Sequence, residues 1–380
     1  MDVLISGASM AGLSAAWWFA RLGHRVTVSE RADGLRPGGA PIDVRGRALG
    51  TARRMGILEQ IDEQKVVIAD PAPVLDATGT QVATLDLRWF ANETDEDIEI
   101  SRDRLNQILL RAIPDHVEFR FKASIASIVD GSDGMDVAFT DGVQGHYDLV
   151  VGADGLHSNV RKLAFGPEKN YVRHFGYYVA LVDLPNDRAW QRGMLNVPGL
   201  TIAVRDAGDG PQAFVLCASP EIEYDYRDVA LHRRIVDGIL SRVDAWQVRE
   251  IRAAFADPAA RGFYFDSVSQ THMPNWIKGN VAVIGDAGHC AALLSGMGTT
   301  LAMVAAETLA STWTDCGGNM AAASPIYHER LRPYVEQCQA FAHEGGPIMV
   351  PATQEALDER NARFRECAVQ FAGRFEPAGA

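Results

Sequence analysis

The hydrophobic pattern near the start of the chain predicts a strand, a helix and a second strand in close succession. Residues 3–6 are a short apolar run, 26–30 are typical of a second strand, and the segment between them is rich in alanine and leucine. The stretch 31–46 holds too much glycine and proline for a regular element, which predicts a long loop. Helical periodicity then returns over 47–62.

The pattern of polar and apolar residues in the middle of the chain predicts mainly strands. Polar and apolar positions alternate over 72–90, which predicts strands, and 117–121, 125–129 and 135–140 are further predicted strands. A helix with Arg102 at its start lies among them. The buried-type apolar run 149–152 then stops at Asp154 and Gly155, and Ser158 is the expected cap of the helix that follows.

The second half changes character and then returns to the first pattern. Residues 170–275 carry many aromatic residues and alternating stretches, which predicts a mixed or antiparallel sheet inserted into the fold, with a helix near 228–242. The alternating stretches are 177–182, 200–204 and 213–217. The elements after them are an apolar strand, a glycine-punctuated loop, an Ala-rich helix and two final helices, at 279–285, 293–298, 299–313, 325–342 and 353–372. We expect Gly345, Gly346 and Pro347 to join the last two helices.

Composition and charge limit the kind of protein. The 380 residues exceed the usual single core of about 100–200 residues, so two domains or one large insertion are expected. With 36 basic and 49 acidic residues the net charge is −13, which argues against nucleic acid or an anionic membrane as a partner. The five cysteines are widely spaced without C-x-x-C pairs, which predicts a cytoplasmic protein with neither a disulfide framework nor a metal site. No signal peptide and no membrane-spanning run are expected.

Candidate chemistry is concentrated in the turn after the first strand, which reads Gly7-Ala8-Ser9-Met10-Ala11-Gly12. A G-x-G-x-x-G turn brings backbone N–H groups at a helix N-terminus within reach of a diphosphate, and Ser9 replaces the middle glycine here. Glu30 ends the second strand 18 residues after Gly12, near the spacing of about 20 for the acid that binds an adenosine ribose. The pattern predicts an α/β fold class with a Rossmann-like dinucleotide-binding unit.

Three segments in this order resemble the fingerprints of class A flavoprotein monooxygenases, the FAD-dependent aromatic hydroxylase family. They are the N-terminal turn with Glu30, the Asp154-Gly155 segment and the segment Gly285-Asp286-Ala287-Gly288-His289. The resemblance covers almost the whole chain and implies a Rossmann-like FAD-binding domain with an inserted mixed β-sheet substrate domain and C-terminal helices. The boundaries it implies are 1–72, 98–168 and 276–342 for the FAD-binding domain, 73–97 and 169–275 for the substrate domain, and 343–380 for the C-terminal helical segment.

The resemblance also assigns residues to parts of FAD. Residues of the first turn and of the end of the second strand would bind the ADP half: Gly7, Ser9, Met10, Ala11, Gly12, Glu30 and Arg31. Arg102 would contact the pyrophosphate, and Gly285 and Asp286 the ribityl or pyrophosphate portion. Asp154 and Gly155 belong to a segment associated with both FAD and the reduced nicotinamide.

The flavin ring would lie between two further segments. By resemblance, Gly296, Met297 and Gly298 would border its pyrimidine end, where their N–H groups could stabilise negative charge on the reduced ring. The loop 41–46 would border the mobile flavin, with Arg45 as a contact.

Three positions depart from the family pattern. Leu293 stands where a proline is usual, Thr300 where an Asn is common, and Ala305 where an acid is common. The missing proline leaves Baeyer–Villiger-type oxygen insertion or epoxidation open beside hydroxylation. We interpret His289 as structural, because a histidine that closes a strand is more often a satisfied core residue.

The activity implied by the resemblance is oxygen transfer from a flavin C4a-hydroperoxide, with NADPH or NADH and O2 as co-substrates, to an aromatic or polycyclic phenolic small molecule. A flavin oxidase or reductase and a non-catalytic FAD-binding protein are the alternatives. The candidates for the substrate wall lie at alternating positions, where core packing is the more common reason for such residues: Tyr177, Tyr178, Met194, Phe214 and Leu216. Neither a catalytic base nor an oligomeric state follows from the sequence.

Overall fold

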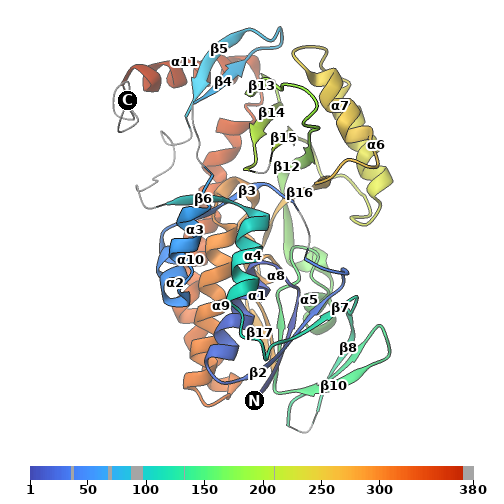
Figure 1. The fold of residues 1–380 in the computed structure, drawn as a ribbon, viewed down its shortest axis with the longest axis vertical. Coiled ribbons are helices and arrows are strands. Elements are labelled where there is room, and N and C mark those ends of the chain that lie inside the picture. The colour runs from blue at the N-terminus through green and yellow to red at the C-terminus, as the bar shows by residue number, and fades with distance from the viewer. Residues whose placement is uncertain (36–37, 67–70, 87–96, 132, 209, 371–380) are drawn as a thin grey trace.

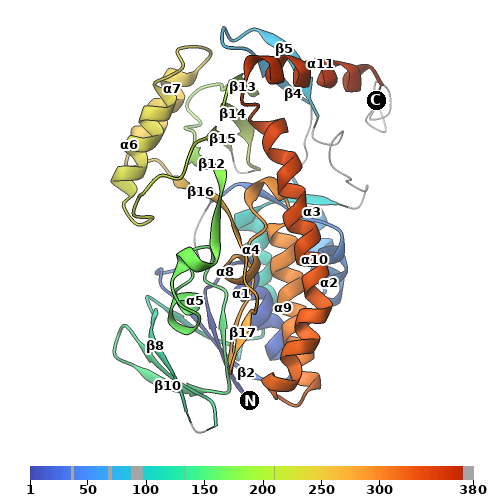
Figure 2. The same ribbon diagram turned by 180° about the vertical axis from the view of Figure 1, so that it is seen from behind.

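The computed structural model describes residues 1–35, 38–66, 71–86, 97–131, 133–208 and 210–370. The molecule is elongated, with the N-terminal sheet at one end and a larger sheet at the other (Figure 1). A long helix, α10 (Met320–Met349), runs beside the N-terminal part and reaches the larger sheet, as the view from behind shows (Figure 2). This helix therefore connects the two parts.

Six strands form the N-terminal sheet, in the spatial order β17 (Ile277–Lys278), β18 (Val281–Val283), β11 (Leu149–Gly152), β1 (Asp2–Ser6), β2 (Arg25–Glu30) and β7 (Glu118–Phe121). All neighbours are parallel except β17 and β18. The register places Ser6 beside Ser29 and Gly152, and Gly152 beside Val283. The carboxyl ends of β1, β2, β11 and β18 therefore meet at one edge of the sheet, where α/β folds bind their ligands.

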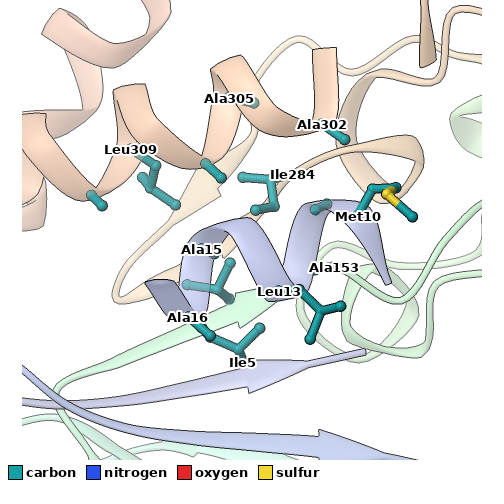
Figure 3. Close-up of a cluster of buried hydrophobic side chains, with 14 of the residues drawn as sticks. Ile5, Met10, Leu13, Ala15, Ala16, Ala153, Ile284, Ala302, Ala305 and Leu309 are labelled. Atoms are coloured by element: carbon teal, nitrogen blue, oxygen red, sulfur yellow. The ribbon is translucent and has the colours of Figure 1, made fainter. Parts of the chain in front are cut away.

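Helix α1 (Met10–Arg21) lies between this sheet and helix α9 (Gly298–Asp315), as Figure 3 shows. Small side chains allow this layered packing, and Ala15 of α1 and Ala305 of α9 are both 0 % exposed. The acid that is common at position 305 in the resembling family would bury its charge here. Ala305 is therefore a packing residue.

Seven strands form the larger sheet, in the order β16 (Tyr264–Thr271), β12 (Val172–Asp183), β15 (Pro211–Ala218), β14 (Leu200–Asp206), β13 (Gly193–Val197), β4 (Ala72–Leu75) and β5 (Gln81–Leu85). β13 and β4 are parallel, and all other neighbours are antiparallel. The predicted mixed or antiparallel sheet, and with it the α/β fold class with an inserted sheet, is confirmed.

The two faces of the larger sheet pack against different parts of the chain. Helices α6 (Val229–Leu240) and α7 (Val248–Ala256) cover one face, through a core that includes Tyr178. The opposite face carries Tyr177 and clusters with α10 and with Leu294, which precedes α9. Successive side chains of a strand point to opposite faces of the sheet, so the neighbours Tyr177 and Tyr178 pack in different clusters.

Two smaller antiparallel sheets are also present. One is formed by β8 (Ile125–Asp130), β9 (Met135–Phe139) and β10 (Gln144–Tyr147), and the other by β3 (Pro41–Val44) and β6 (Ile98–Ser101). Further helices and 3-10 turns are α2 (Arg47–Met55), α3 (Leu58–Glu63), α4 (Arg102–Ala112), α5 (Asn159–Ala164), η2 (Glu168–Asn170), α8 (Asp286–His289), η3 (Leu293–Ser295) and α11 (Gln354–Gln370). Within the described ranges, no helix is both long and apolar enough to cross a bilayer.

Strand β3 corrects the prediction of a loop without regular structure over 31–46. It pairs antiparallel with β6, with Pro41 opposite Ser101 and Val44 opposite Ile98. Proline is tolerated because it opens the strand. The partner strand lies far along the chain, so local composition could not indicate the pairing. Residues 36–37 of this stretch lie outside the described residues.

The single helix predicted over 47–62 is wrong in one respect. Gly56 takes a left-handed φ of 73° and ends α2, so that α3 begins as a separate helix. The parts of the predicted strand and helix at 87–90 and 371–372 lie outside the described residues.

Helix α10 corrects the predicted break at Gly345, Gly346 and Pro347, because it continues through all three residues. A Cβ on Gly345 would lie 2.5 Å from the carbonyl oxygen of Leu294, and one on Gly346 would lie 2.6 Å from the hydroxyl oxygen of Tyr177. The glycines therefore allow close packing of the helix against the loop and the large sheet rather than ending it.

Candidate cofactor and substrate site

The turn between β1 and α1 is shaped by two glycines. Gly7 has a left-handed φ of 105°, and a Cβ there would lie 2.5 Å from the carbonyl oxygen of Ala153. A Cβ on Gly12 would lie 1.8 Å from the carbonyl oxygen of Gly7. No side chain of the described residues caps α1, and the hydroxyl of Ser9 instead accepts a hydrogen bond from Arg102 at 3.3 Å. The first backbone N–H groups of α1 are therefore available to an anionic ligand.

Glu30 lies beside this turn. Its carboxylate accepts hydrogen bonds from the backbone N–H groups of Ala8 and Ala32, both at 2.9 Å. These bonds hold the carboxylate at the edge where β1 and β2 end, close to the first turn. Arg31 is exposed to solvent just beyond β2. The structure thus brings Glu30 to the turn and leaves Arg31 at the surface.

Arg102 and Asp286 come together from distant segments. Arg102 begins α4, and its guanidinium donates hydrogen bonds to the carbonyl of Gly38 at 3.4 Å and to the hydroxyl of Ser9 at 3.3 Å. Asp286 begins α8. Many protein atoms surround its side chain, yet solvent still reaches the carboxylate, so Asp286 lines a deep but accessible space. Burial raises the pKa of Asp286, while a hydrogen bond with Cys290 and the positive charge of Arg102 act against this rise.

The third motif packs directly on the first. A Cβ on Gly285 would lie 2.8 Å from the Cβ of Ala11, so a glycine is required beside the start of α1. Met10 and Ala11 are themselves 7 % and 8 % exposed. The wall of the site is therefore formed by the backbone and the close packing of Met10, Ala11 and Gly285.

The loop before α9 is held by its own serine. The hydroxyl of Ser295 donates to the carbonyl of Ala292 at 2.8 Å and accepts from the N–H of Met297 at 3.1 Å. No side chain of the described part of the chain caps α9, and a Cβ on Gly298 would meet no protein atom within 4 Å. The first N–H groups of this helix therefore lie beside open space, where they can stabilise negative charge. Leu293, at the position of the missing proline, is 45 % exposed.

Strand β3 lies against this loop. Asp43 and Arg45 form an ion pair at 2.7 Å, and a Cβ on Gly296 would lie 3.4 Å from the carboxylate of Asp43. The hydroxyl of Thr300 accepts a hydrogen bond from the backbone N–H of Arg45 and donates one to its carbonyl, both at 3.3 Å. The threonine at this departure from the family pattern therefore ties β3 to the start of α9.

Asp154 is turned toward the helix that follows it. Its carboxylate accepts hydrogen bonds from the hydroxyl of Ser158 and from the N–H groups of Asn159 at 2.8 Å and Val160 at 3.0 Å. Ser158 itself caps α5, which confirms its predicted role. Asp154 thus has a structural task in α5, and contacts of Asp154 and Gly155 with FAD or nicotinamide stay a prediction.

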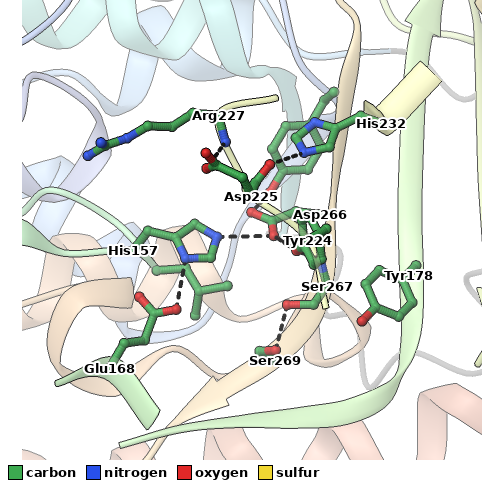
Figure 4. A network of polar contacts seen from close by, with 12 residues as sticks. His157, Glu168, Tyr178, Tyr224, Asp225, Arg227, His232, Asp266, Ser267 and Ser269 are labelled. Carbon is green, nitrogen blue, oxygen red and sulfur yellow. Dashed lines mark hydrogen bonds and ion pairs between the residues drawn. The ribbon is translucent and has the colours of Figure 1, made fainter. Parts of the chain in front are cut away.

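Sequence reasoning missed a polar network beside Asp154. Figure 4 shows His157 between two acids, with Nδ1 2.9 Å from Glu168 and Nε2 3.2 Å from Asp266. The hydroxyl of Tyr224 also donates to Asp266, at 2.6 Å. Burial lowers the pKa of His157, but the bonds to both acids outweigh burial and raise the pKa to about 9. Asp266 lies 109 residues after His157 in the chain, so no local sequence pattern could reveal the contact between these two residues.

The candidate substrate residues divide among three clusters. Tyr177 and Phe214 are partly buried on the face of the large sheet that contacts the loop before α9, and Leu216 is fully buried in the same cluster. Tyr178 is buried beneath α6 and α7, and Met194 is buried in a separate cluster beside α11. Core packing therefore explains Leu216, Tyr178 and Met194, whereas Tyr177 and Phe214 stay candidates for substrate contact.

His289 is a core residue. It is 1 % exposed, and its ring lies edge-on to Trp276 with the ring centres 5.3 Å apart. Burial lowers the pKa of His289 to about 4, so the imidazole is neutral near pH 7. The packing agrees with the structural interpretation, but the expected hydrogen-bond partners are missing, because neither ring nitrogen of His289 has one among the described residues. Within the described ranges, no three His, Cys, Asp or Glu side chains are grouped as metal ligands.

Removing the carboxylate of Asp286 tests its assignment to FAD. We expect Asp286→Ala to bind FAD about 10- to 100-fold more weakly, because a charged hydrogen-bond acceptor contributes about 1.5–3 kcal/mol. Titration of the FAD-free protein, followed by flavin fluorescence, measures the Kd. Asp187→Ala, which removes an exposed carboxylate, is the matched control. Equal affinity in the parent and in Asp286→Ala would mean that Asp286 does not contact the cofactor.

Comparison with known proteins places this geometry in a family. Residues 1–342 match the family model described as an FAD binding domain. A flavin-dependent monooxygenase of Legionella longbeachae is 32 % identical over 371 residues, which cover 96 % of this chain and 94 % of the relative. The uncharacterized protein Rv1260 of Mycobacterium tuberculosis is 36 % identical over 371 residues, which cover 94 % of this chain and 96 % of the relative.

A solved structure of similar fold agrees with these relatives. The crystal structure of the tetracycline destructase Tet(51) is 28 % identical in sequence and superposes with a TM-score of 0.82, covering 100 % of this chain and 99 % of that one. The likeness thus also covers the end of α10 and helix α11, which lie beyond the region matched by the family model. The chain therefore belongs to the class A flavoprotein monooxygenases and is an FAD-dependent oxidoreductase.

Proposed function

We propose that this enzyme uses NADPH or NADH and O2 to hydroxylate an aromatic or polycyclic phenolic small molecule. The observation that carries the proposal is the contact between the loop before α9 and the aromatic face of the large sheet, where Leu294 clusters with Tyr177 and Phe214. An apolar, partly aromatic wall beside the predicted flavin position suits a planar ring. The full-length likeness to a tetracycline destructase supports a polycyclic phenol, because tetracycline is such a compound.

The residues present suit FAD. The turn at Gly7 and Gly12 leaves no room for a side chain, which lets a diphosphate approach the N–H groups at the start of α1. Arg102 would add its charge to the pyrophosphate site, and Glu30 would accept hydrogen bonds from the adenosine ribose. When bound, FAD supplies hydride transfer and oxygen activation.

The protein's own task is placement, charge stabilisation and exclusion of water. The open N–H groups at the start of α9 would stabilise negative charge at the pyrimidine end of the flavin. Tyr177 and Phe214, packed near Met349 of α10, would hold the substrate ring and keep water from the reacting carbon. Thr300 would keep β3 and Arg45 in place beside this region.

A substrate panel tests the proposed function. We expect at least one phenol in a panel that includes tetracycline to raise NAD(P)H oxidation by the FAD-loaded enzyme roughly tenfold or more, since substrate occupancy completes the site. With ¹⁸O₂, the product should carry one labelled oxygen atom on a ring carbon. The matched control is the same panel with boiled enzyme and free FAD.

Other products would separate the alternatives. Stimulated NAD(P)H oxidation that yields hydrogen peroxide and unlabelled product would indicate an oxidase or reductase. A labelled oxygen inserted between two carbons would indicate Baeyer–Villiger chemistry, and a labelled epoxide would indicate epoxidation. A panel in which no compound stimulates NAD(P)H oxidation or acquires ¹⁸O would contradict the proposal.

A further inference from the structure

A second cavity lies between α10 and the segment that joins β16 to β17. Its volume is about 340 Å³, at the lower end of the range for small-molecule sites. The described residues that line it belong to the end of β16, to this joining segment and to the middle of α10, and they include none of the candidate FAD or substrate residues. We call it the α10 cavity.

The wall of the α10 cavity is apolar on its inner side. Met273, Trp276 and Val335 line the cavity and are 4 %, 1 % and 3 % exposed. All three pack into the core of the N-terminal part of the molecule. This apolar wall suits the hydrocarbon part of a small ligand.

A guanidinium group lies against this wall. The guanidinium carbon of Arg332 is 4.3 Å from the ring centre of Trp276. Its Nη groups donate hydrogen bonds to the carbonyl of Met273 at 3.4 and 3.5 Å and to the carbonyl of Pro274 at 2.7 Å. In the described part of the chain no carboxylate forms an ion pair with Arg332. The cation is therefore fixed by neutral groups, and its charge is left for a ligand.

Further cationic side chains lie close to the cavity. His272 lines it and is exposed, and its Nε2 lies 3.0 Å from the side-chain oxygen of Gln270. Partial burial lowers the pKa of His272, and the positive charges of Arg173 and His343 lower it further. A bound anion would counteract this effect and favour protonated His272.

Glu336 brings a negative charge to the same lining. It is exposed, one helical turn after Arg332, and the two side chains form no ion pair among the described residues. Solvent therefore screens its charge. Because Arg332, Arg173 and the two histidines lie on the positive side of the balance, the cavity favours an anionic ligand although the net charge of the chain is −13.

The α10 cavity also adjoins the third motif, residues 285–289. Thr271 and Gln339 both line the cavity. The hydroxyl of Thr271 donates to the carbonyl of Asp286 at 2.8 Å, and the amide of Gln339 donates to the carbonyl of Cys290 at 3.1 Å. A ligand in the cavity would therefore contact residues that hold this motif in place.

We propose that the α10 cavity binds a small organic carboxylate, whose hydrocarbon part packs on the apolar wall and whose carboxylate bonds to Arg332. The inference goes beyond the proposed function and does not depend on the substrate. A guanidinium matches the geometry of a carboxylate and forms charge-assisted hydrogen bonds with it. The apolar wall distinguishes such an acid from an inorganic anion.

The test follows methionine methyl groups by ¹³C NMR in the FAD-saturated protein. The signals of Met273 and Met297 are identified by their absence from Met273→Leu and Met297→Leu. Met273 reports on the α10 cavity, and Met297 reports on the loop before α9. Cyclohexanecarboxylate, benzoate and 2-naphthoate are titrated beside their carboxamides. We expect at least one acid to shift the Met273 signal with a Kd about 10- to 100-fold lower than that of its amide, the range for one charged hydrogen-bonded pair.

Three variants sharpen this test. Arg332→Met should remove the preference for the acid, whereas Arg234→Met, at an exposed arginine of α6, should behave like the parent. Glu336→Gln should tighten binding of the acid about two- to fivefold, the range for one screened charge.

The other outcomes also decide the proposal. No shift of the Met273 signal with any acid, equal affinity for acid and amide, or a preference that survives in Arg332→Met would overturn it. A shift confined to the Met297 signal would place the acid beside the loop before α9 and would equally refute the α10 cavity as its site.

A second substitution replaces Arg332→Met if that variant does not fold. His272→Asp brings a negative charge to an exposed position of the lining and should suppress binding of the acid, while His116→Asp, at another exposed histidine, is the matched control. An unchanged preference in His272→Asp would then overturn the proposal.

Discussion

Gly12→Ala is expected to remove FAD from the enzyme. The new Cβ would lie 1.8 Å from the carbonyl oxygen of Gly7, far inside any allowed contact, and Gly7 itself lies close to Ala153, the residue that follows β11. The turn must therefore open, which moves the first N–H groups of α1 away from the pyrophosphate. Loss of two hydrogen bonds to a charged group, each worth about 1.5–3 kcal/mol, weakens FAD binding by roughly 100-fold or more.

The matched control for this substitution is Gly238→Ala. Gly238 is also a glycine inside a helix, α6, but a Cβ there would meet no atom within 4 Å. Alanine at this position should raise helix stability by up to about 1 kcal/mol and leave FAD binding unchanged. The absorbance ratio of flavin to protein after gel filtration measures retention in both variants. Full retention of FAD by Gly12→Ala would contradict the position given to the first turn.

The main layers could be predicted because each leaves a local trace in the sequence. The turn at Gly7 requires a left-handed φ and a close approach of Ala153, and glycine is the residue that allows both. Side chains that alternate between two buried faces make the strand around Tyr177 and Tyr178 visible. The converging motifs follow from the parallel sheet, since the carboxyl ends of β1, β2, β11 and β18 meet at one edge.

Features that depend on distant partners could not be predicted. Strand β3 exists because β6 pairs with it, and its own residues resemble a loop. Helix α10 passes through Gly345 and Gly346 because Leu294 and Tyr177 lie against them, while glycine and proline locally indicate a break. The same reason applies to the site, where Thr300 acts on the backbone of a strand from another part of the chain.

The pair of His157 and Asp266 makes stability depend on pH. The pKa of His157 in the folded protein is about 9, above its ordinary 6.5, so its contribution is complete below about pH 6.5 and is lost as the pH rises through 9. Burial would raise the pKa of Asp266, but hydrogen bonds from His157 and Tyr224 outweigh burial and lower it below its ordinary 3.8. The contribution of Asp266 is therefore present above pH 3.8 and lost only in stronger acid, so the pair stabilises most between about pH 4 and 6.5.

Asp266→Asn is accordingly expected to lower the free energy of unfolding by about 3 kcal/mol at pH 6, because it leaves a partly buried, protonated His157 with only one of its two acids. The difference from the parent should shrink as the pH rises from 6.5 to 9, since a neutral imidazole needs the carboxylate less. Urea unfolding of the FAD-saturated protein across this range measures the difference. His116→Gln, at an exposed histidine, is the matched control and should leave the profile unchanged. A difference that stays constant with pH would mean that Asp266 supports the fold through Tyr224 rather than through His157.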